Sequence, residues 1–174
     1  MPGRPHLTPR RRTTLGLRAG TRRLTTVGLL AALVLCSGTL SSCAGPQVDV
    51  TPVDSPPASC AAVLAALPAT IDGHDRRGVT KAARASARAW GDPAIVLRCG
   101  VGRPASYTPT GDCLVIDDIE WYVEAATGGT IFTIVGADPR VEVSVPTADT
   151  PPSDVLVDVG NAIAATIKHP TCAG

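Results

Sequence analysis

The sequence predicts a small α+β domain, an antiparallel β-meander of about four strands covered by an N-terminal and a C-terminal helix. Two segments, 95–101 and 141–145, alternate apolar and polar residues with the period of a strand that has one face on a core. A third segment, 153–167, carries an apolar stripe with the period of a helix. The chain has 174 residues, the length of one domain. Helices that cover one face of such a sheet would bury its apolar side.

The N-terminus has the pattern of a secretory signal. Arg22 and Arg23 precede an apolar, uncharged run at 24–35, and small residues follow it up to Ser42. Residues 1–42 are therefore predicted to be a lipoprotein-type signal peptide.

Cys43 is the predicted lipidation site. The segment 40–45 reads Leu-Ser-Ser-Cys-Ala-Gly and resembles the bacterial lipobox. Small side chains before the cysteine would let the backbone enter a signal peptidase, and the thiol would accept a diacylglycerol. Cys36 cannot take this role, because the large Leu35 precedes it.

An uncleaved membrane span is the alternative for this segment, because residues 24–42 approach the roughly 20 residues that a spanning helix needs. Both interpretations keep the N-terminal arginines on the cytoplasmic side of the membrane and place the chain beyond Cys43 on its outer side. The predicted location is the extracytoplasmic face of the cell membrane, with a lipid anchor.

The charge is divided at Cys43. Seven arginines and no acid precede it, whereas nine Lys or Arg and fifteen Asp or Glu follow it, a difference of −6. Binding to a phosphate backbone needs clustered basic residues and a basic domain. A nucleic-acid partner is therefore not expected.

The exported part begins with a proline-rich segment. Residues 43–57 contain four prolines and no apolar period, which predicts an extended tether without a fold of its own. The domain then covers 58–174. Ser59 is the expected cap of a helix at 60–67, which Pro68 ends. Alanines and arginines favour a second helix at 81–90.

The central strand follows a turn at 91–93. Pro93 stands where no ladder partner is yet required for its missing N–H group. Beyond it a hairpin is expected, with Asp117-Asp118 as a two-residue turn. This register puts five apolar residues on one face: Leu114, Ile116, Ile119, Trp121 and Val123. Glu120, Tyr122 and Glu124 would then point to the opposite side, towards solvent or a partner.

Two further strands and a helix complete the expected domain. Gly128-Gly129 turns the chain into a strand at 131–135, and 140–145 alternates with its valines inward. Ser153 is the expected cap of the last helix. Its apolar stripe consists of Leu156, Val159, Gly160, Ile163 and Ile167.

Four cysteines remain after the signal: Cys60, Cys99, Cys113 and Cys172. An even number outside the cytosol predicts disulfides, and four cysteines allow three pairings. The pairing expected first is Cys99 with Cys113 across a loop, and Cys60 with Cys172. Cys60 joined to Cys99 is an alternative, since the first helix can pack beside that strand. A metal site is disfavoured, because no Cys-x-x-Cys pair occurs.

The candidates for catalysis are few. His74 and His169 are the histidines after the signal, and their positions favour solvated side chains. The motifs of serine hydrolases, zinc proteases, P-loops and dinucleotide sites do not occur. Asp117, Asp118 and Glu120 fit a solvated turn better than a calcium site. We expect no cofactor and no metal, and we expect Trp90 and Trp121 to be core aromatics.

Three segments carry a family resemblance. Residues 89–101, 119–121 and 141–146 resemble the actinobacterial domain-of-unknown-function family 3515, a group of exported or membrane-anchored proteins. The motif residues are Trp90, Gly91, Asp92, Pro93, Arg98, Cys99, Gly100 and Trp121. The chain departs from the family pattern at Asp117-Asp118 and at 136–138. Because the family has no assigned activity, the resemblance implies a location and a fold only.

Two functions follow from these observations. The first is a non-catalytic binding or scaffolding module of the cell envelope, partnered by the membrane through its anchor and by an envelope protein or wall component. The rival is an envelope hydrolase that uses His74 or His169 with an acid. The absence of a nucleophile–base motif favours the first function.

Overall fold

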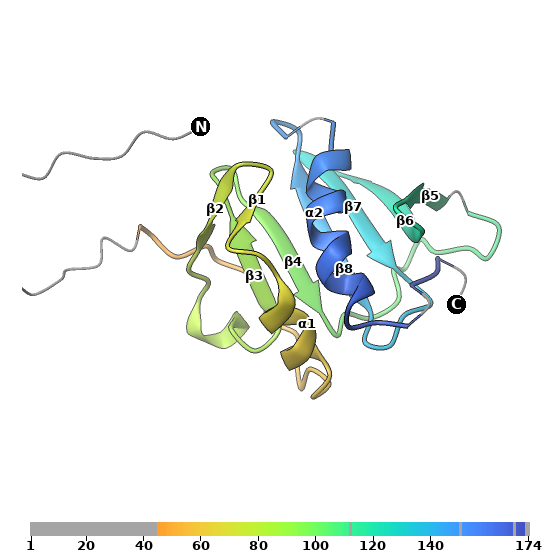
Figure 1. The fold of residues 1–174 in the computed structure, drawn as a ribbon, viewed down its shortest axis with the longest axis horizontal. Coiled ribbons are helices and arrows are strands. Elements are labelled where there is room, and N and C mark those ends of the chain that lie inside the picture. The colour runs from red at the N-terminus through yellow and green to blue at the C-terminus, as the bar shows by residue number, and fades with distance from the viewer. Residues whose placement is uncertain (1–44, 112, 150, 169, 173–174) are drawn as a thin grey trace, which may run out of the picture. The chain divides into compact units, whose positions relative to one another are not determined.

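A computed structural model describes residues 45–111, 113–149, 151–168 and 170–172 (Figure 1). These residues belong to one compact unit that builds its hydrophobic core from its own side chains. The predicted signal peptide, Cys43 and His169 lie outside the described residues.

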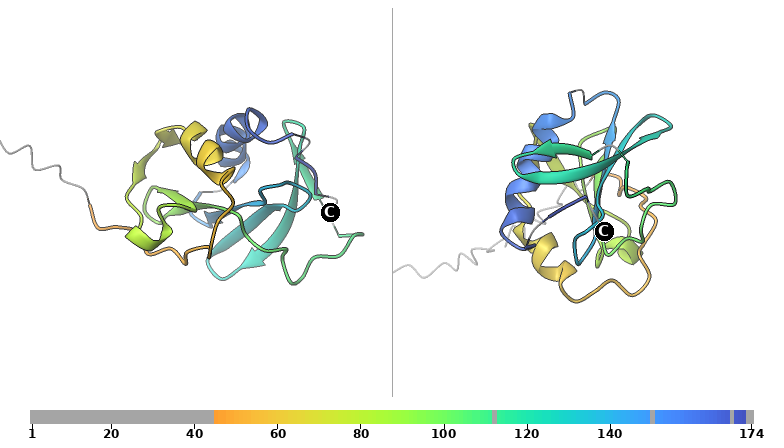
Figure 2. Two further views of the ribbon diagram at one scale, coloured as in Figure 1. Left: turned by 90° about the horizontal axis from the view of Figure 1, so that it is seen from below. Right: turned by 90° about the vertical axis from the view of Figure 1, so that its right-hand side faces the viewer.

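The fold is a sheet of eight antiparallel strands in the order β1-β2-β3-β4-β8-β7-β6-β5, with two α-helices. The strands are β1 Thr70–Ile71, β2 His74–Arg77, β3 Ala87–Trp90, β4 Ile95–Cys99, β5 Cys113–Ile116, β6 Ile119–Ala126, β7 Gly129–Ile134 and β8 Val141–Pro146. The helices are α1 Cys60–Ala66 and α2 Ser153–Ala164, and a 3₁₀ turn η1 spans Lys81–Ala83. Both α-helices cover the same face of the sheet (Figure 2). The helix-covered antiparallel sheet was predicted, but four strands were too few.

The second predicted helix is wrong. Instead of a helix at 81–90, the chain forms η1 and then the strand β3. Ala87 and Ala89 are fully buried on one face of this strand, and Trp90 is fully buried on the other. Burial on both faces of a sheet outweighs the small helix preference of alanine.

The main core lies between the sheet and the two helices. The whole predicted stripe, from Leu156 to Ile167, is buried there, although α2 itself ends at Ala164. Gly160 allows close packing, because a Cβ atom at this position would lie 3.1 Å from Cδ1 of Ile119. The alternating burial of β4 and β8 also agrees with the predicted pattern.

The hairpin of β5 and β6 has the predicted register, with Leu114 opposite Trp121. Both turn residues have positive φ, 48° for Asp117 and 61° for Asp118, as a type I′ turn requires. The prediction for the second face is wrong at Tyr122, which is buried. Tyr107 and Cys172 pack against it, since the 100–111 loop and the C-terminal segment cover this face.

The segment predicted to be a free tether packs against the sheet from Val48 onward. Val48 bridges Val79 in parallel, and Val50 is buried. Together with Val79, Ala83 and the β3 alanines they form a second, smaller core on the face away from the helices. The alternating Val48 and Val50 cover a surface of small residues. The prolines of this segment predicted an extended chain but not this packing.

All four cysteines of the domain are in disulfides, as predicted, but the first-choice pairing is wrong. Cys60 is bonded to Cys99, and Cys113 is bonded to Cys172. The prediction assumed that β4 and β5 are neighbours, whereas β8, β7 and β6 separate them. The C-terminal segment runs along β6, where the N–H group of Glu120 donates to Pro170 O, and so reaches β5.

Candidate ligand cleft

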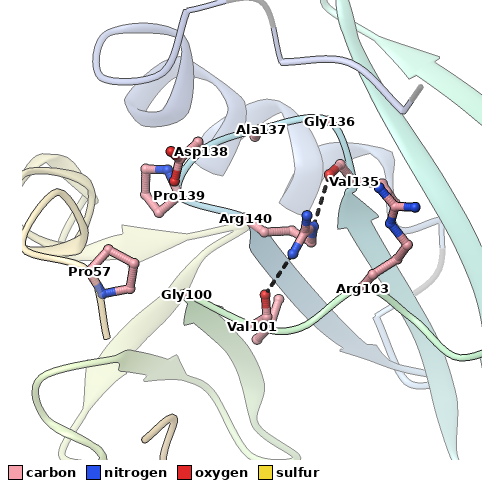
Figure 3. Close-up of a pocket in the computed structure, with 10 residues that line it drawn as sticks. All are labelled: Pro57, Gly100, Val101, Arg103, Val135, Gly136, Ala137, Asp138, Pro139 and Arg140. Carbon is pink, nitrogen blue, oxygen red and sulfur yellow. Dashed lines mark hydrogen bonds between the residues drawn. The ribbon is translucent and has the colours of Figure 1, made fainter. Parts of the chain in front are cut away.

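A cleft of about 480 Å³ lies where three connecting segments meet at one end of the sheet (Figure 3). One segment precedes α1, one follows β4, and one joins β7 to β8. The lining residues are Pro57, Gly100, Val101, Arg103, Val135, Gly136, Ala137, Asp138, Pro139 and Arg140.

Arg140 holds two of these segments together. Its Nε donates to Val135 O at 2.9 Å, and its Nη1 donates to Val101 O at 3.2 Å. Figure 3 shows the side chain lying between these two residues. The Gly100 N–H group in turn donates to Arg140 O at 2.8 Å. The cleft is therefore built on a hydrogen-bonded frame.

Gly100 allows the wall at Pro57 to come close. Its φ is +84°, and a Cβ atom on it would lie 2.7 Å from Cδ of Pro57. A residue with a side chain would be strained here in its backbone and would also clash. The Cys60–Cys99 disulfide holds the same two segments covalently.

Two guanidinium groups give the cleft its charge. Arg103 is exposed, and its guanidinium carbon lies 5.2 Å from the ring centre of Tyr107, a cation–π contact. Arg140 is half-buried, and Nη2 takes no part in its two bonds to the frame. Asp138 is the single acidic residue of the lining and is exposed. Planar guanidinium groups match the oxygen pairs of carboxylate and phosphate groups.

The side chains of the lining define which interactions the cleft offers. Its ten residues, all within the described part of the chain, include no Ser, Thr, Cys or His. Arg103 and Arg140 can recognise an anion by charge and hydrogen bonds, and Asp138 adds one carboxylate.

A second polar feature joins His74 to Asp149. The Nε2 atom of His74 lies 3.0 Å from Oδ1 of Asp149, whose side chain is only 9% exposed. The other oxygen of Asp149 is buried and has no hydrogen-bond partner among the described residues. Gly91 lies against the imidazole, since a Cβ atom on it would meet Nδ1 at 2.8 Å. An acid that orients a histidine is one half of a general-base arrangement.

The comparisons with known proteins give one match. A family model described as "Protein of unknown function (DUF3515)" matches residues 24–172. The chain belongs to this family. No curated protein and no solved structure matches it. The matched region contains both disulfides and every segment of the cleft.

The motif residues of this family member have different places in the fold. Gly100 lines the cleft, and Cys99 beside it forms the disulfide. Trp90 and Trp121 are fully buried core residues, as expected. The remaining motif residues lie outside the cleft lining: Gly91, Asp92, Pro93 and Arg98. Arg98 pairs with Glu142 on the neighbouring strand at 2.7 Å.

The two arginines of the cleft are not among the site residues that the sequence predicts. Arg103 lies in a loop rich in proline and threonine, and the sequence pattern predicts Arg140 as the first residue of an alternating strand. The sequence feature that could have marked Arg140 as a site residue is its position directly after Pro139, at the end of a glycine-containing loop. Its partners, the carbonyl groups of Val101 and Val135, have no signature in the sequence.

The other candidates do not come together. Within the described ranges no group of three or more His, Cys, Asp or Glu could hold a metal ion. Among the same residues, no helix is long and apolar enough to cross a membrane.

Proposed function

We propose that this protein is a non-catalytic binding module, held on the outer face of the cytoplasmic membrane by a lipid at Cys43. The observation that carries the binding role is the cleft with Arg103 and Arg140 on a hydrogen-bonded frame. Its ligand is a carboxylate or phosphate group of an envelope protein or a wall component.

The disulfides support an exported domain. Cys60–Cys99 and Cys113–Cys172 use all four cysteines that follow Cys43. Such bonds persist in oxidising compartments and are rare in the reducing cytosol. The resemblance of residues 40–45 to a lipobox adds the anchor to this location.

We expect that Cys43→Ala will abolish lipidation and leave an unprocessed precursor, because the thiol is the acceptor of the diacylglycerol. Metabolic labelling with a fatty-acid probe measures this directly, and Cys36→Ala serves as the matched control that should keep its label. Equal labelling of the Cys43 variant and the parent would reject the lipid anchor. An unlabelled parent that stays in the membrane fraction would favour the uncleaved span.

A second candidate function is an envelope hydrolase, which the His74–Asp149 pair favours. The two residues are 75 positions apart in sequence, yet the fold brings them to 3.0 Å. A histidine held by a buried carboxylate can take a proton from water or from a hydroxyl group. His169, the other histidine of this hypothesis, lies outside the described residues.

One experiment separates the two functions. Envelope partners captured by the anchored protein are compared for the parent, for Arg103→Glu and for His74→Ala with His169→Ala. We expect Arg103→Glu to reduce capture at least tenfold by placing an acid at the cleft, while the histidine variant captures normally. Arg103→Lys, which keeps the charge, should retain part of the capture. If the histidine variant instead loses the capture of envelope partners, with an unchanged circular dichroism spectrum, the hydrolase is favoured.

A further inference from the structure

The basic residues of the domain are concentrated at one edge of the sheet. Five of the nine Lys and Arg residues that follow Cys43 lie on β2, η1 and β3 and the turn after η1, with no acidic residue between Asp75 and Asp92. We refer to these five residues as the basic edge: Arg76, Arg77, Lys81, Arg84 and Arg88.

The charges of the basic edge are held in place mainly by backbone carbonyl groups. Arg77 donates to Gly91 O and to Pro46 O, and Arg88 donates to Arg84 O and Ala87 O. Among the described residues, the ion pair at this edge joins Arg77 to Asp92 at 3.6 Å, and the Asp92 side chain is 86% exposed. Carbonyl partners orient a guanidinium group but leave its full charge.

The members of the basic edge also act on one another. Burial, followed by the nearby charge of Arg76, lowers the pKa of the Arg88 guanidinium from its ordinary value. Lys81 and Arg84 are exposed, and so is Arg76, which lies over the Trp90 ring at 5.6 Å. A bound anion would relieve this repulsion between like charges.

An acidic hairpin lies at the other end of the strand order, while Asp72, Asp75 and Asp92 flank the basic edge. Strands β2 and β3 lie near one end of the strand order, and β5 and β6 lie at the other end (Figure 1). The β5–β6 hairpin carries Asp117, Asp118, Glu120 and Glu124. The hairpin is therefore an end of the sheet that repels anions, whereas the uninterrupted run of basic residues between Asp75 and Asp92 attracts them.

The chain leaves the domain towards Cys43 at the basic edge. Val48 is the first residue that pairs with the sheet, and its N–H group donates to Gly78 O at 2.8 Å, one residue after Arg77. Cys43 precedes Val48 by five positions, so their Cα atoms are at most about 17 Å apart. Pro46, between them, is already bonded to Arg77. A lipid on Cys43 therefore brings the basic edge to the membrane surface.

We propose that the basic edge binds the anionic headgroups of the membrane in which the protein is anchored. This inference rests on the proposed anchor at Cys43. The lipid keeps the protein at the membrane, and the basic edge sets the orientation of the domain, with the acidic hairpin of β5 and β6 turned away from the bilayer. Basic clusters next to a membrane attachment bind acidic headgroups in this way, with a range of about one Debye length.

Vesicle binding of the domain without its lipid tests this proposal. Residues 44–174 contain the whole described core and belong to one compact unit. We expect this fragment to bind vesicles of phosphatidylglycerol at low salt, to bind much less at physiological salt, and to leave pure phosphatidylcholine vesicles unbound. Lys81→Glu should weaken binding about fivefold, and Lys81→Glu with Arg84→Glu at least tenfold. Lys168→Glu is the matched control, since it makes the same charge change beside the turn of the β5–β6 hairpin and should bind like the parent.

Three results would overturn the proposal. They are no binding to phosphatidylglycerol vesicles at low salt, equal weakening by Lys81→Glu and Lys168→Glu, and binding to soluble polyphosphate with none to vesicles. The last result would identify a wall polymer as the ligand instead. Fatty-acid labelling at Cys43 is independent of all three, so the anchor and the basic edge fail separately.

Discussion

Replacing Cys60 and Cys99 together by alanine should lower the free energy of unfolding by about 4 kcal/mol. The disulfide closes a loop with a sequence separation of 39, and the chain-entropy relation gives about this value for such a loop. Domains of this size have a total stability of about 5–15 kcal/mol. Chemical denaturation of residues 44–174, followed by circular dichroism, measures the loss.

The matched control is the double alanine variant of Cys113 and Cys172, whose sequence separation of 59 predicts a similar loss. The two variants should differ in the cleft. Cys99 precedes Gly100 at the wall that Pro57 contacts, so only the first variant should also lose capture of envelope partners under conditions where it is still folded. Non-reducing peptide mapping that finds Cys99 joined to Cys113 would contradict the expected difference.

Trp90→Ala should destabilise the domain by about 3–5 kcal/mol, because it removes a fully buried indole and leaves a cavity. Trp90 packs in the main core, donates from Nε1 to Pro68 O at 3.2 Å and lies under the guanidinium group of Arg76. Loss of the indole therefore affects the core and the segment after α1 together.

Trp90→Phe separates these contributions. It keeps an aromatic ring in the core and loses the hydrogen bond, so we expect a loss of only about 1–2 kcal/mol. Thermal and urea unfolding of both variants give the comparison. A Trp90→Ala variant as stable as Trp90→Phe would mean that this part of the core collapses around the missing side chain.

Local patterns predicted the elements whose partners are close in sequence. The β5–β6 register follows from a two-residue turn, and the α2 stripe follows from helical spacing. β3 was missed because alanine favours a helix locally. Whether this segment forms a strand depends on its packing against Val48 and Val50, which lie about forty residues earlier in the chain.

The predicted disulfide pairing was wrong and the cleft was not predicted, both for the same reason. Both depend on the place of β8, which lies between β4 and β7 and so separates Cys99 from Cys113. It also places Arg140 beside Val101, about forty residues away in sequence. A meander of consecutive strands, the simplest topology for the predicted pattern, has neither contact.

The connectivity of the disulfides has a consequence for how the protein matures. Each bond joins cysteines that are consecutive among the four that follow Cys43, first Cys60 with Cys99 and then Cys113 with Cys172. In a chain that crosses a membrane N-terminus first, each cysteine pair is complete before the next cysteine emerges. Once the thiol of Cys43 carries the proposed lipid, an oxidase that joins the remaining thiols in their order of arrival makes the native bonds directly. The slow thiol–disulfide reshuffling that interleaved bonds demand is not needed.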